Sequence, residues 1–317
     1  MRYGALEAGG TKMVMAVGDE TGRILEQRSI PTTTPQETMP QIIEYFADKD
    51  IAALGVGAFG PVDVVKGSPT YGHILNTPKI PWRHYDIAGT LAKADNYGYI
   101  LETPKLAWRN KDLLGGLKKE LNVPMGIDTD VNGSCLGEMT YGCAKGLDTV
   151  AYFTIGTGIG AGIAVGGRLL HGMMHPEAGH ILIAKNPHDP GKSVCPCHDS
   201  CLEGLASGPS IEARWGKKAY ELVDNQVVWE LESEYLAKAM TNIILTLSPQ
   251  KIILGGGVMH QEQLFPMIRA KVLEYLNHYY ETPYLENMDE YIVPASLHDD
   301  QGIMGAVRLA QLAYEAV

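Results

Sequence analysis

The chain has 317 residues, of which 45% are apolar, and its formal net charge is −11. This length predicts one large domain or two ordinary ones, and the apolar share is sufficient for a sizeable core. The acidic balance argues against binding to a nucleic-acid backbone or an anionic membrane surface, because both require clustered lysine and arginine. A small anionic ligand held by backbone N–H groups is still compatible with this charge.

The first residues, MRYGALEAGG, contain no charged leader followed by an apolar run, so we expect no secretory signal. No uninterrupted apolar stretch approaches ~20 residues, which predicts that no segment spans a membrane. We therefore expect a cytoplasmic protein in a reducing compartment, where metal ligands and free thiols are more common than disulfides.

Short apolar runs separated by turn residues predict strands in the first sixty residues. The turn 8–12, AGGTK, joins the first two of these runs, and a proline and an acidic residue suited to a first helical turn follow the third. The expected strands are Tyr3–Glu7, Met13–Val17, Ile24–Ile30 and Ala53–Ala58, with a helix beginning near Pro35.

A similar order recurs later, because Val150–Ile155 predicts a strand ending in a glycine loop and Ala161–Val165 predicts its return strand. Strand, glycine loop and strand thus occur twice, which indicates a duplicated unit. We expect a smaller N-terminal α/β lobe over 1–117, with the C-terminal helix 300–317 packing on it, and a larger α/β lobe over 118–299. Further expected elements are a strand at 125–127, a helix after it, a helix over 236–247, a strand at Lys251–Leu254 and a closing helix over 303–313.

Three glycine-rich turns each follow an apolar strand, and glycine lets backbone N–H groups approach a phosphate closely. Any one of them is more simply a tight turn, but three together favour a nucleotide site. The sequence around Gly10-Thr11-Lys12 lacks the spacing of a Walker A loop. The loop at 156–160 leads into a strand rather than a helix, which argues against a dinucleotide-binding fingerprint. The three turns are Gly9-Gly10-Thr11-Lys12, Gly156-Thr157-Gly158-Ile159-Gly160 and Gly255-Gly256-Gly257.

Five segments, in this order, together resemble the ROK family of sugar kinases, and the resemblance covers nearly the whole chain. It implies an α/β fold of the actin-like ATPase (ribonuclease H-like) type, with two lobes around a cleft. The stretches 201–209 and 212–216 resemble the bacterial fructokinase branch of this family. The five segments are Glu7-Ala8-Gly9-Gly10-Thr11-Lys12, Asp128-Thr129-Asp130-Val131-Asn132, Gly156-Thr157-Gly158-Ile159-Gly160, Glu177-Ala178-Gly179-His180 and Leu254-Gly255-Gly256-Gly257-Val258.

Phosphoryl transfer from ATP needs a base for the attacking hydroxyl, a metal ion on the phosphates and donors for the transferred group. The resemblance implies that Asp130 is the general base for the 6-hydroxyl of a hexose and that Mg²⁺ accompanies ATP. It also implies that Asn132, Glu177, His180 and Glu203 bind the sugar. The residues expected to bind ATP are Gly9, Gly10, Thr11, Lys12, Thr157, Gly158, Gly208, Pro209, Gly255, Gly256 and Gly257.

Two positions depart from the family pattern. Thr129 stands where glucokinases commonly have asparagine, and this difference fits a different hexose. Glu7 replaces the more usual aspartate of the first phosphate loop, so a carboxylate remains for a Mg²⁺ or water-mediated contact. The segments 57–63, 76–78 and Trp82 resemble the part of the smaller lobe that lines the sugar cleft.

Three of the five cysteines lie in the stretch CPCHDSC at 195–201. Zinc prefers four nitrogen or sulfur ligands in a tetrahedron, and cysteines at this density in a reducing compartment favour a metal over a disulfide. We expect structural Zn²⁺ bound by His180, Cys195, His198 and Cys201, with Cys197 as the alternative to His198. In the family such a metal fixes the loop that carries Glu203 and orients His180.

The expected activity is ATP-dependent phosphorylation of a hexose, with fructose converted to fructose 6-phosphate. Mannose, glucose or an N-acetylhexosamine are alternative substrates, since epimers differ by one or two hydrogen bonds. A sugar-responsive regulator is a further alternative, although the acidic charge, the first strand beginning at residue 3 and Asp130 argue against it. A zinc-binding scaffold alone leaves the glycine loops unexplained. The resemblance also implies a homodimer, and the acidic charge predicts no nucleic-acid or membrane partner.

Overall fold

The computed structural model describes residues 1–9, 11–33, 35–58, 64, 121 and 123–316. The backbone forms two compact units. The first unit comprises Met1–Lys145, Leu170–Pro176 and Asp300–Val317, and the second comprises Gly146–Leu169 and Glu177–Asp299. The chain thus passes from one unit to the other four times.

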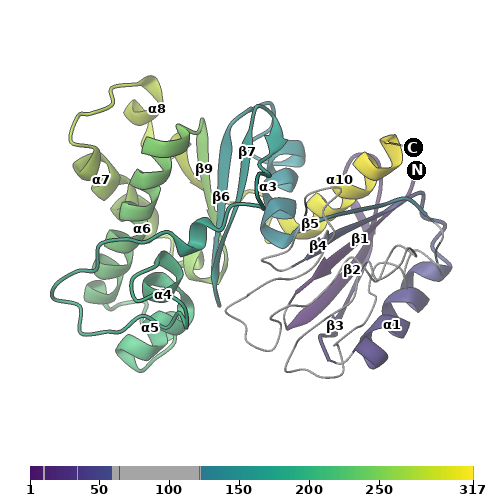
Figure 1. Cartoon of the computed structure of the whole chain (residues 1–317), viewed down its shortest axis with the longest axis horizontal. Helices are drawn as coiled ribbons and strands as arrows, with labels where there is room; N and C mark the ends of the chain where they lie inside the picture. The colour runs from purple at the N-terminus through teal and green to yellow at the C-terminus, as the bar shows by residue number, and fades with distance from the viewer. Residues whose placement is uncertain (10, 34, 59–63, 65–120, 122, 317) are drawn as a thin grey trace. The chain divides into compact units, whose positions relative to one another are not determined.

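The first unit contains a five-stranded sheet in the order β3-β2-β1-β4-β5 (Figure 1). The first three strands form an antiparallel meander, and β4 and β5 extend the sheet on the other side of β1 in the parallel direction. All five occur close to where the apolar runs predict strands. Their bounds are β1 (Tyr3–Ala8), β2 (Lys12–Gly18), β3 (Ile24–Pro31), β4 (Leu54–Ala58) and β5 (Met125–Thr129).

The second unit contains a sheet of five strands in the order β10-β9-β6-β7-β8. Here β6, β7 and β8 form the meander, while β9 and β10 run parallel to β6. Strand order and direction are those of the first sheet, so the duplicated unit expected from the glycine loops is confirmed at the level of topology. The bounds are β6 (Val150–Ile155), β7 (Ile159–Val165), β8 (Arg168–Leu169), β9 (Lys251–Gly255) and β10 (Ile292–Pro294).

Helices connect the parallel strands of the second unit, as a sheet with parallel neighbours requires. In the second unit α6 and α7 lie side by side, and α4 packs on α6. The helices are α1 (Pro35–Ala47), α3 (Asp130–Tyr141), α4 (Leu202–Ala206), α5 (Gly208–Trp215), α6 (Gln226–Leu247), α7 (Leu264–Leu276), α8 (Pro283–Glu286), α9 (Met288–Tyr291) and α10 (Gln301–Glu315), with 3-10 turns η3 (Ala178–His180), η4 (Ala219–Glu221) and η5 (Gly257–His260).

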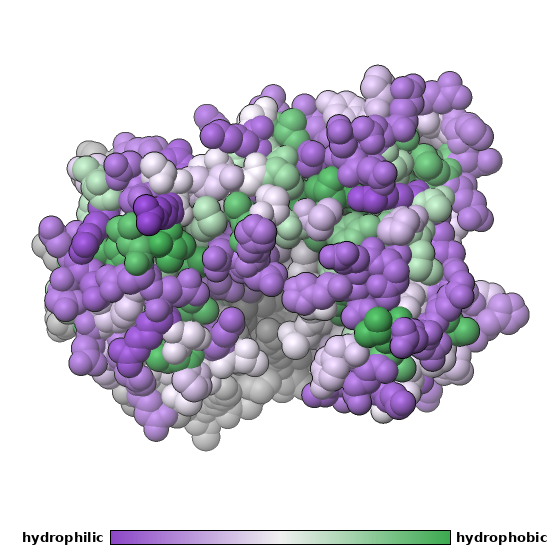
Figure 2. Space-filling model, turned by 180° about the vertical axis from the view of Figure 1, so that it is seen from behind, coloured by the Kyte–Doolittle hydropathy of each residue, from purple (hydrophilic) through white to green (hydrophobic). Residues whose placement is uncertain are grey.

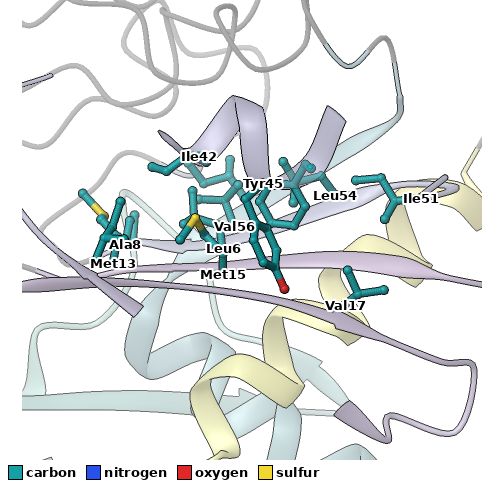
Figure 3. Packing of buried hydrophobic residues seen from close by; sticks show 14 of the residues in the cluster. Leu6, Ala8, Met13, Met15, Val17, Ile42, Tyr45, Ile51, Leu54 and Val56 are labelled. Atoms are coloured by element: carbon teal, nitrogen blue, oxygen red, sulfur yellow. The ribbon is translucent and has the colours of Figure 1, made fainter. Parts of the chain in front are cut away.

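The two faces of the first sheet bury different kinds of side chain, because successive residues of a strand point to opposite sides. On one face, Leu6, Met13 and Met15 belong to a buried cluster that includes Ile42 and Tyr45 of α1. Figure 3 shows these side chains gathered between the strands and α1. Large, flexible side chains therefore fill the space under α1.

The opposite face of the first sheet packs against α10 through small residues such as Ala5. A Cβ atom added to Gly55 of β4 would collide with the carbonyl oxygen of Ala306 in α10. In the same way, a Cβ atom at Gly305 of α10 would collide with the carbonyl oxygen of Gly133 in α3. The helix α10 thus packs backbone against backbone on β4 and α3, which only glycine permits at these positions.

One face of the described surface is mainly polar. On the face drawn in Figure 2, hydrophilic residues cover most of the described surface, and apolar residues form small separate patches. Within the described ranges, no helix has both the length and the apolar character needed to cross a membrane.

The expected lobe boundary at residues 117 and 118 lies outside the described residues. Both β5 and α3, which follow it, belong to the first unit, because β5 pairs with β4 and α3 packs against α10. The expected lobe 118–299 therefore differs from the second unit, which begins at Gly146. Two segments separated by about half of the chain, α3 and α10, come together here, and nothing in the local sequence signals such a contact.

The close contact of α10 with α3 predicts opposite effects for two glycine substitutions. Gly305→Ala should lower the free energy of unfolding by about 3 kcal/mol or more, because the backbone must separate to admit a methyl group. Gly133→Ala is the matched control: the nearest atom to its added Cβ is 3.7 Å away. It should leave stability unchanged or raise it by up to about 1 kcal/mol through helix propensity. Urea unfolding of both variants tests this, and equal stabilities would contradict the backbone contact.

Candidate active site

Asp130 is the first residue of α3 and follows directly on β5. The hydroxyl oxygen of Thr129 caps this helix by accepting the N–H of Asn132 at 3.0 Å. One carboxylate oxygen of Asp130 accepts the N–H of Val131 at 2.8 Å. The Asp130 carboxylate therefore lies at a helix N-terminus, where the peptide dipoles favour negative charge. Thr129 keeps this turn in place, which gives a physical reason for a hydroxyl at that position.

A hydrogen-bonded group of three side chains supports the same turn. The Asp128 carboxylate accepts the side-chain N–H of Asn132 at 2.7 Å on one oxygen and contacts Nε2 of His171 at 2.9 Å with the other. Asp128 and Asn132 are buried, whereas the His171 side chain is 30% exposed. The hydrogen bond to Asp128 raises the pKa of His171, and burial opposes this rise. His171 is thus held against the strand end that carries Asp130.

Glu7 lies near the end of β1 in a crowded acidic environment. Burial and then the charge of Asp130 raise the pKa of the Glu7 carboxyl to about 6, while Lys12 lowers it and Asp300 raises it further. A Cβ atom added to Gly302, in the first turn of α10, would lie 3.0 Å from a Glu7 carboxylate oxygen. Glycine at that position thus leaves room for this carboxylate, whose pKa a nearby cation would lower.

The first glycine loop turns sharply between β1 and β2. The N–H of Gly9 donates to the carbonyl oxygen of Lys12 at 3.0 Å, and the Thr32 hydroxyl donates to the carbonyl oxygen of Gly9 at 2.8 Å. The N–H of Thr32 also donates to the carbonyl oxygen of Thr11 at 3.0 Å. These bonds fix the sides of the loop. The expected ATP-binding residue Gly10 lies outside the described residues, as do the expected sugar-cleft residues of 59–63 and 76–82.

The glycine segments of the second unit converge at one edge of its sheet. The parallel strands β6 and β9 end side by side, with Thr154 opposite Gly255. The N–H of Gly208, at the start of α5, donates to the carbonyl oxygen of Gly156 at 2.8 Å. A Cβ atom added to Gly156 would lie 3.9 Å from the backbone nitrogen of Gly257. Three segments far apart in sequence, around residues 157, 208 and 256, therefore form one group of closely spaced backbones.

Glu203 connects the glycine loop after β6 with the histidine expected to bind sugar. One carboxylate oxygen of Glu203 accepts the N–H of Ile159 at 2.9 Å. The other lies 3.9 Å from Nε2 of His180. Gly179, beside that histidine, packs so closely on Ile159 that an added Cβ would collide with its carbonyl oxygen. The backbone approach at Gly179 thus fixes where the His180 ring lies.

Four side chains of the second unit form a group that could hold a metal ion: His180, Cys195, His198 and Cys201. Nδ1 of His180 lies 3.9 Å from the sulfur of Cys195 and 3.6 Å from that of Cys201. Nδ1 of His198 lies 3.5 Å from the sulfur of Cys195. A tetrahedral zinc ion with its usual bond lengths separates sulfur and nitrogen ligands by about 3.5 Å. The donor atoms and their spacing therefore fit Zn²⁺.

His198 belongs to this group, whereas Cys197 is exposed and does not belong to it. Burial raises the pKa of the Cys201 thiol to about 12 and lowers the pKa of His180. A bound cation reverses the effect of burial on a thiol, because it stabilises the thiolate directly. Cys201 also accepts the N–H of Gly204 through its sulfur, at 3.3 Å, and is the N-cap of the helix that carries Glu203.

A buried ion pair attaches the loop before the cysteines to α5. Nε of Arg214 donates to the Asp189 carboxylate at 2.8 Å, and both side chains are almost fully buried. The Tyr235 hydroxyl donates to the same carboxylate at 2.6 Å, and the N–H of Gly191 donates at 2.7 Å. Burial alone would raise the pKa of Asp189, but these hydrogen bonds lower it below its usual value. Because Arg214 also donates to the carbonyl oxygen of Leu205 at 2.9 Å, it joins the loop to both α4 and α5.

The expected site residues fall into two groups. Asp130 and Asn132 lie in the first unit, while Glu177, His180 and Glu203 lie in the second. Within each unit the structure brings most of them together, and the backbone carbonyl oxygen of Glu177 accepts the N–H of His180 at 2.9 Å. The pairing of Asp128 with His171 has no local signal in the sequence, because the two residues are distant along the chain and only the fold brings them together.

The strand order and directions of the two sheets are those of the actin-like ATPase fold, and a family comparison agrees with this. The ROK family matches residues 3–96 and 94–313, and the chain belongs to this family.

Two relatives match along almost their entire length. A protein named fructokinase from Pediococcus pentosaceus is 44% identical over 313 residues, which cover 99% of each chain. A protein named fructokinase from Streptococcus mutans serotype c is 38% identical over 315 residues, covering 98% of this chain and 97% of the relative. The crystal structure of a ROK hexokinase from Thermus thermophilus superposes with a TM-score of 0.71 at 24% identity and full coverage of both chains. That likeness confirms the actin-like fold.

The raised pKa of Glu7 predicts that this carboxylate destabilises the folded protein. The pKa of Glu7 is higher in the folded chain, about 6, than in the unfolded chain. Ionised Glu7 therefore lowers the free energy of unfolding by its full amount above the folded pKa, and this loss of stability vanishes below the unfolded pKa. In metal-free buffer at about pH 8, Glu7→Gln should raise the free energy of unfolding by about 1–2 kcal/mol, a gain that shrinks as the pH falls toward about 4.5.

Urea unfolding at both pH values measures this effect. Glu281→Gln, at an exposed residue, is the control and should change stability little at either pH. A Glu7→Gln protein less stable than the wild type at the higher pH would contradict the electrostatic origin of the penalty.

Proposed function

We propose that this chain is an ATP-dependent hexose kinase that transfers the γ-phosphoryl group to the 6-hydroxyl, with fructose as its substrate. The observation that carries the proposal is the Asp130 carboxylate at the end of β5, together with the converging glycine backbones of the second unit. Two full-length relatives that bear the name fructokinase support the choice of sugar. Mannose, glucose or an N-acetylhexosamine are the alternatives that a substrate panel separates.

Asp130 acts as the general base in this proposal. It orients the 6-hydroxyl and accepts its proton as the oxygen attacks the γ-phosphorus, and the bond to the leaving ADP oxygen breaks. Mg²⁺, when bound with ATP, neutralises charge on the phosphates, and Glu7 is the carboxylate of the first unit best suited to face it. Lys12, the first residue of β2, supplies positive charge close to Glu7.

The second unit supplies contacts to both substrates in this proposal. Backbone N–H groups of the glycine segments near residues 157, 208 and 256 hold the nucleotide. Glu203, His180 and Glu177 bind sugar hydroxyls, since carboxylates and imidazoles can accept and donate hydrogen bonds to neighbouring hydroxyl groups. Asn132 of the first unit adds a further sugar contact.

We propose further that the group His180, Cys195, His198 and Cys201 binds structural Zn²⁺. Four protein ligands close the coordination shell, so no position is left for a catalytic water. Bound zinc would hold the loop that precedes Glu203 and fix the ring of His180, whose other nitrogen faces Glu203. The homodimer implied by the family resemblance remains a proposal that light scattering of the purified chain tests.

The zinc proposal predicts different metal contents for two serine variants of the same loop. Cys195→Ser should lose most of the bound zinc and melt at a lower temperature, because it removes a thiolate ligand. Cys197→Ser is the matched control and should keep its zinc. Elemental analysis of the purified proteins, together with His198→Asn, checks the ligand set. Zinc lost from Cys197→Ser but kept in His198→Asn would assign the fourth ligand to Cys197 instead.

The kinase proposal predicts that Asp130→Asn lowers the rate of fructose phosphorylation at least about 100-fold, because the amide cannot accept the proton. A coupled ADP-release assay with a panel of hexoses measures this and identifies the sugar. Equal rates for Asp130→Asn and the wild type would rule out the general base. If the wild type phosphorylates no hexose, a sugar-binding protein without kinase activity becomes the better interpretation.

A further inference from the structure

The segment 170–176 has an unusual place in the chain. The flanking segments on both sides, Gly146–Leu169 and Glu177–Asp299, belong to the second unit. The seven residues Leu170–Pro176 between them belong to the first unit. The segment connects β8 with the turn η3, which carries the expected sugar ligand His180. The attachment of this segment to the first unit therefore fixes the point, after Pro176, at which the chain enters the second unit again.

His171 attaches this segment by a polar contact with a buried acid. Nε2 of His171 lies 2.9 Å from one oxygen of the Asp128 carboxylate, and Asp128 is only 4% exposed. A hydrogen bond to a buried carboxylate is among the stronger side-chain interactions, because removing the donor leaves a charged acceptor without its partner. Nε2 must donate here, since the carboxylate only accepts.

The second oxygen of Asp128 fixes the amide of Asn132. It accepts from the Asn132 side-chain nitrogen at 2.7 Å and from the backbone N–H of Thr129 at 2.8 Å. With its nitrogen on Asp128, the Asn132 amide has its oxygen buried, and this oxygen has no hydrogen-bond partner in the described chain. A buried acceptor of this kind is suited to a ligand hydroxyl. The orientation of Asn132 thus follows from the charge on Asp128.

We infer that His171 and Asp128 are positioning residues for the turn 128–132: His171 holds the Asp128 carboxylate, which in turn orients the Asn132 amide and the strand end that carries Asp130. This inference rests on the proposed kinase function. Neither residue transfers a proton to the substrate. Their contribution is to keep Asp130 and Asn132 in the geometry that the attacking hydroxyl needs, where a displacement of about 1 Å costs about 100-fold in rate.

Two His171 variants separate positioning from simple packing. His171→Leu removes the donor at similar size and should lower kcat about 10- to 100-fold, with the KM for ATP unchanged. His171→Gln keeps an N–H near the position of Nε2 and should retain most of the activity. Met173→Leu, at a residue of the same segment that is 94% exposed, is the control and should match the wild type. Melting temperatures show whether each variant is folded.

A double-mutant cycle with Asp128→Asn tests whether His171 acts through Asp128. In that case His171→Leu should add little to the loss caused by Asp128→Asn alone. The inference is overturned if His171→Leu has the wild-type kcat, if His171→Gln loses as much as His171→Leu, or if the two losses multiply in the double variant. Wild-type activity in the same assay reports on the kinase proposal separately, so failure of one is distinguishable from failure of the other.

Discussion

The first unit depends on direct backbone contact between α10 and its neighbours. Gly55 in β4 and Gly305 in α10 remove the Cβ atoms that would separate α10 from the sheet and from α3. The same helix begins beside the Glu7 carboxylate at Gly302. Because α3 starts at Asp130, the packing that stabilises the unit also fixes the position of its acidic residues. Stability and the geometry of the candidate site thus rely on one set of close contacts, which tolerates little change in side-chain volume.

The sequence predicted the repeating elements well and the long-range contacts poorly. Strands β1, β2, β6 and β9 and their glycine loops follow from local composition, because apolar runs and glycine turns act over a few residues. The group His180, Cys195, His198 and Cys201 could also be predicted from the sequence, since three of its members share one loop. The contact of His171 with Asp128 could not be predicted, because nothing local marks two distant residues as neighbours. The place of β5 and α3 in the first unit is of the same kind, since it follows from pairing with β4 and packing on α10.

The loop 189–201, which contains the three cysteines, is held at its two ends by different kinds of interaction. Near the cysteines, the side chains converge at ligand distances, while Asp189 at the other end is buried with Arg214 and Tyr235. Forming a buried ion pair costs desolvation energy. Removing one partner destabilises a protein more than replacing the whole pair with apolar residues, because one buried charge is left unpaired. Arg214 lies on α5, the helix that begins at Gly208 beside the glycine loop after β6. The loop 189–201 and the glycine backbone around Gly208 therefore share a support.

The distribution of each unit over distant parts of the chain affects how the protein folds as it is made. A nascent chain emerges N-terminus first, and domains usually fold as they emerge. The first sheet, however, buries one face against α10, which begins only at Gln301. On the ribosome, β1, β2 and β4 must remain without that cover until α10 has been synthesised. The second unit, complete once Asp299 has emerged, can therefore reach its folded state before the unit that begins the chain.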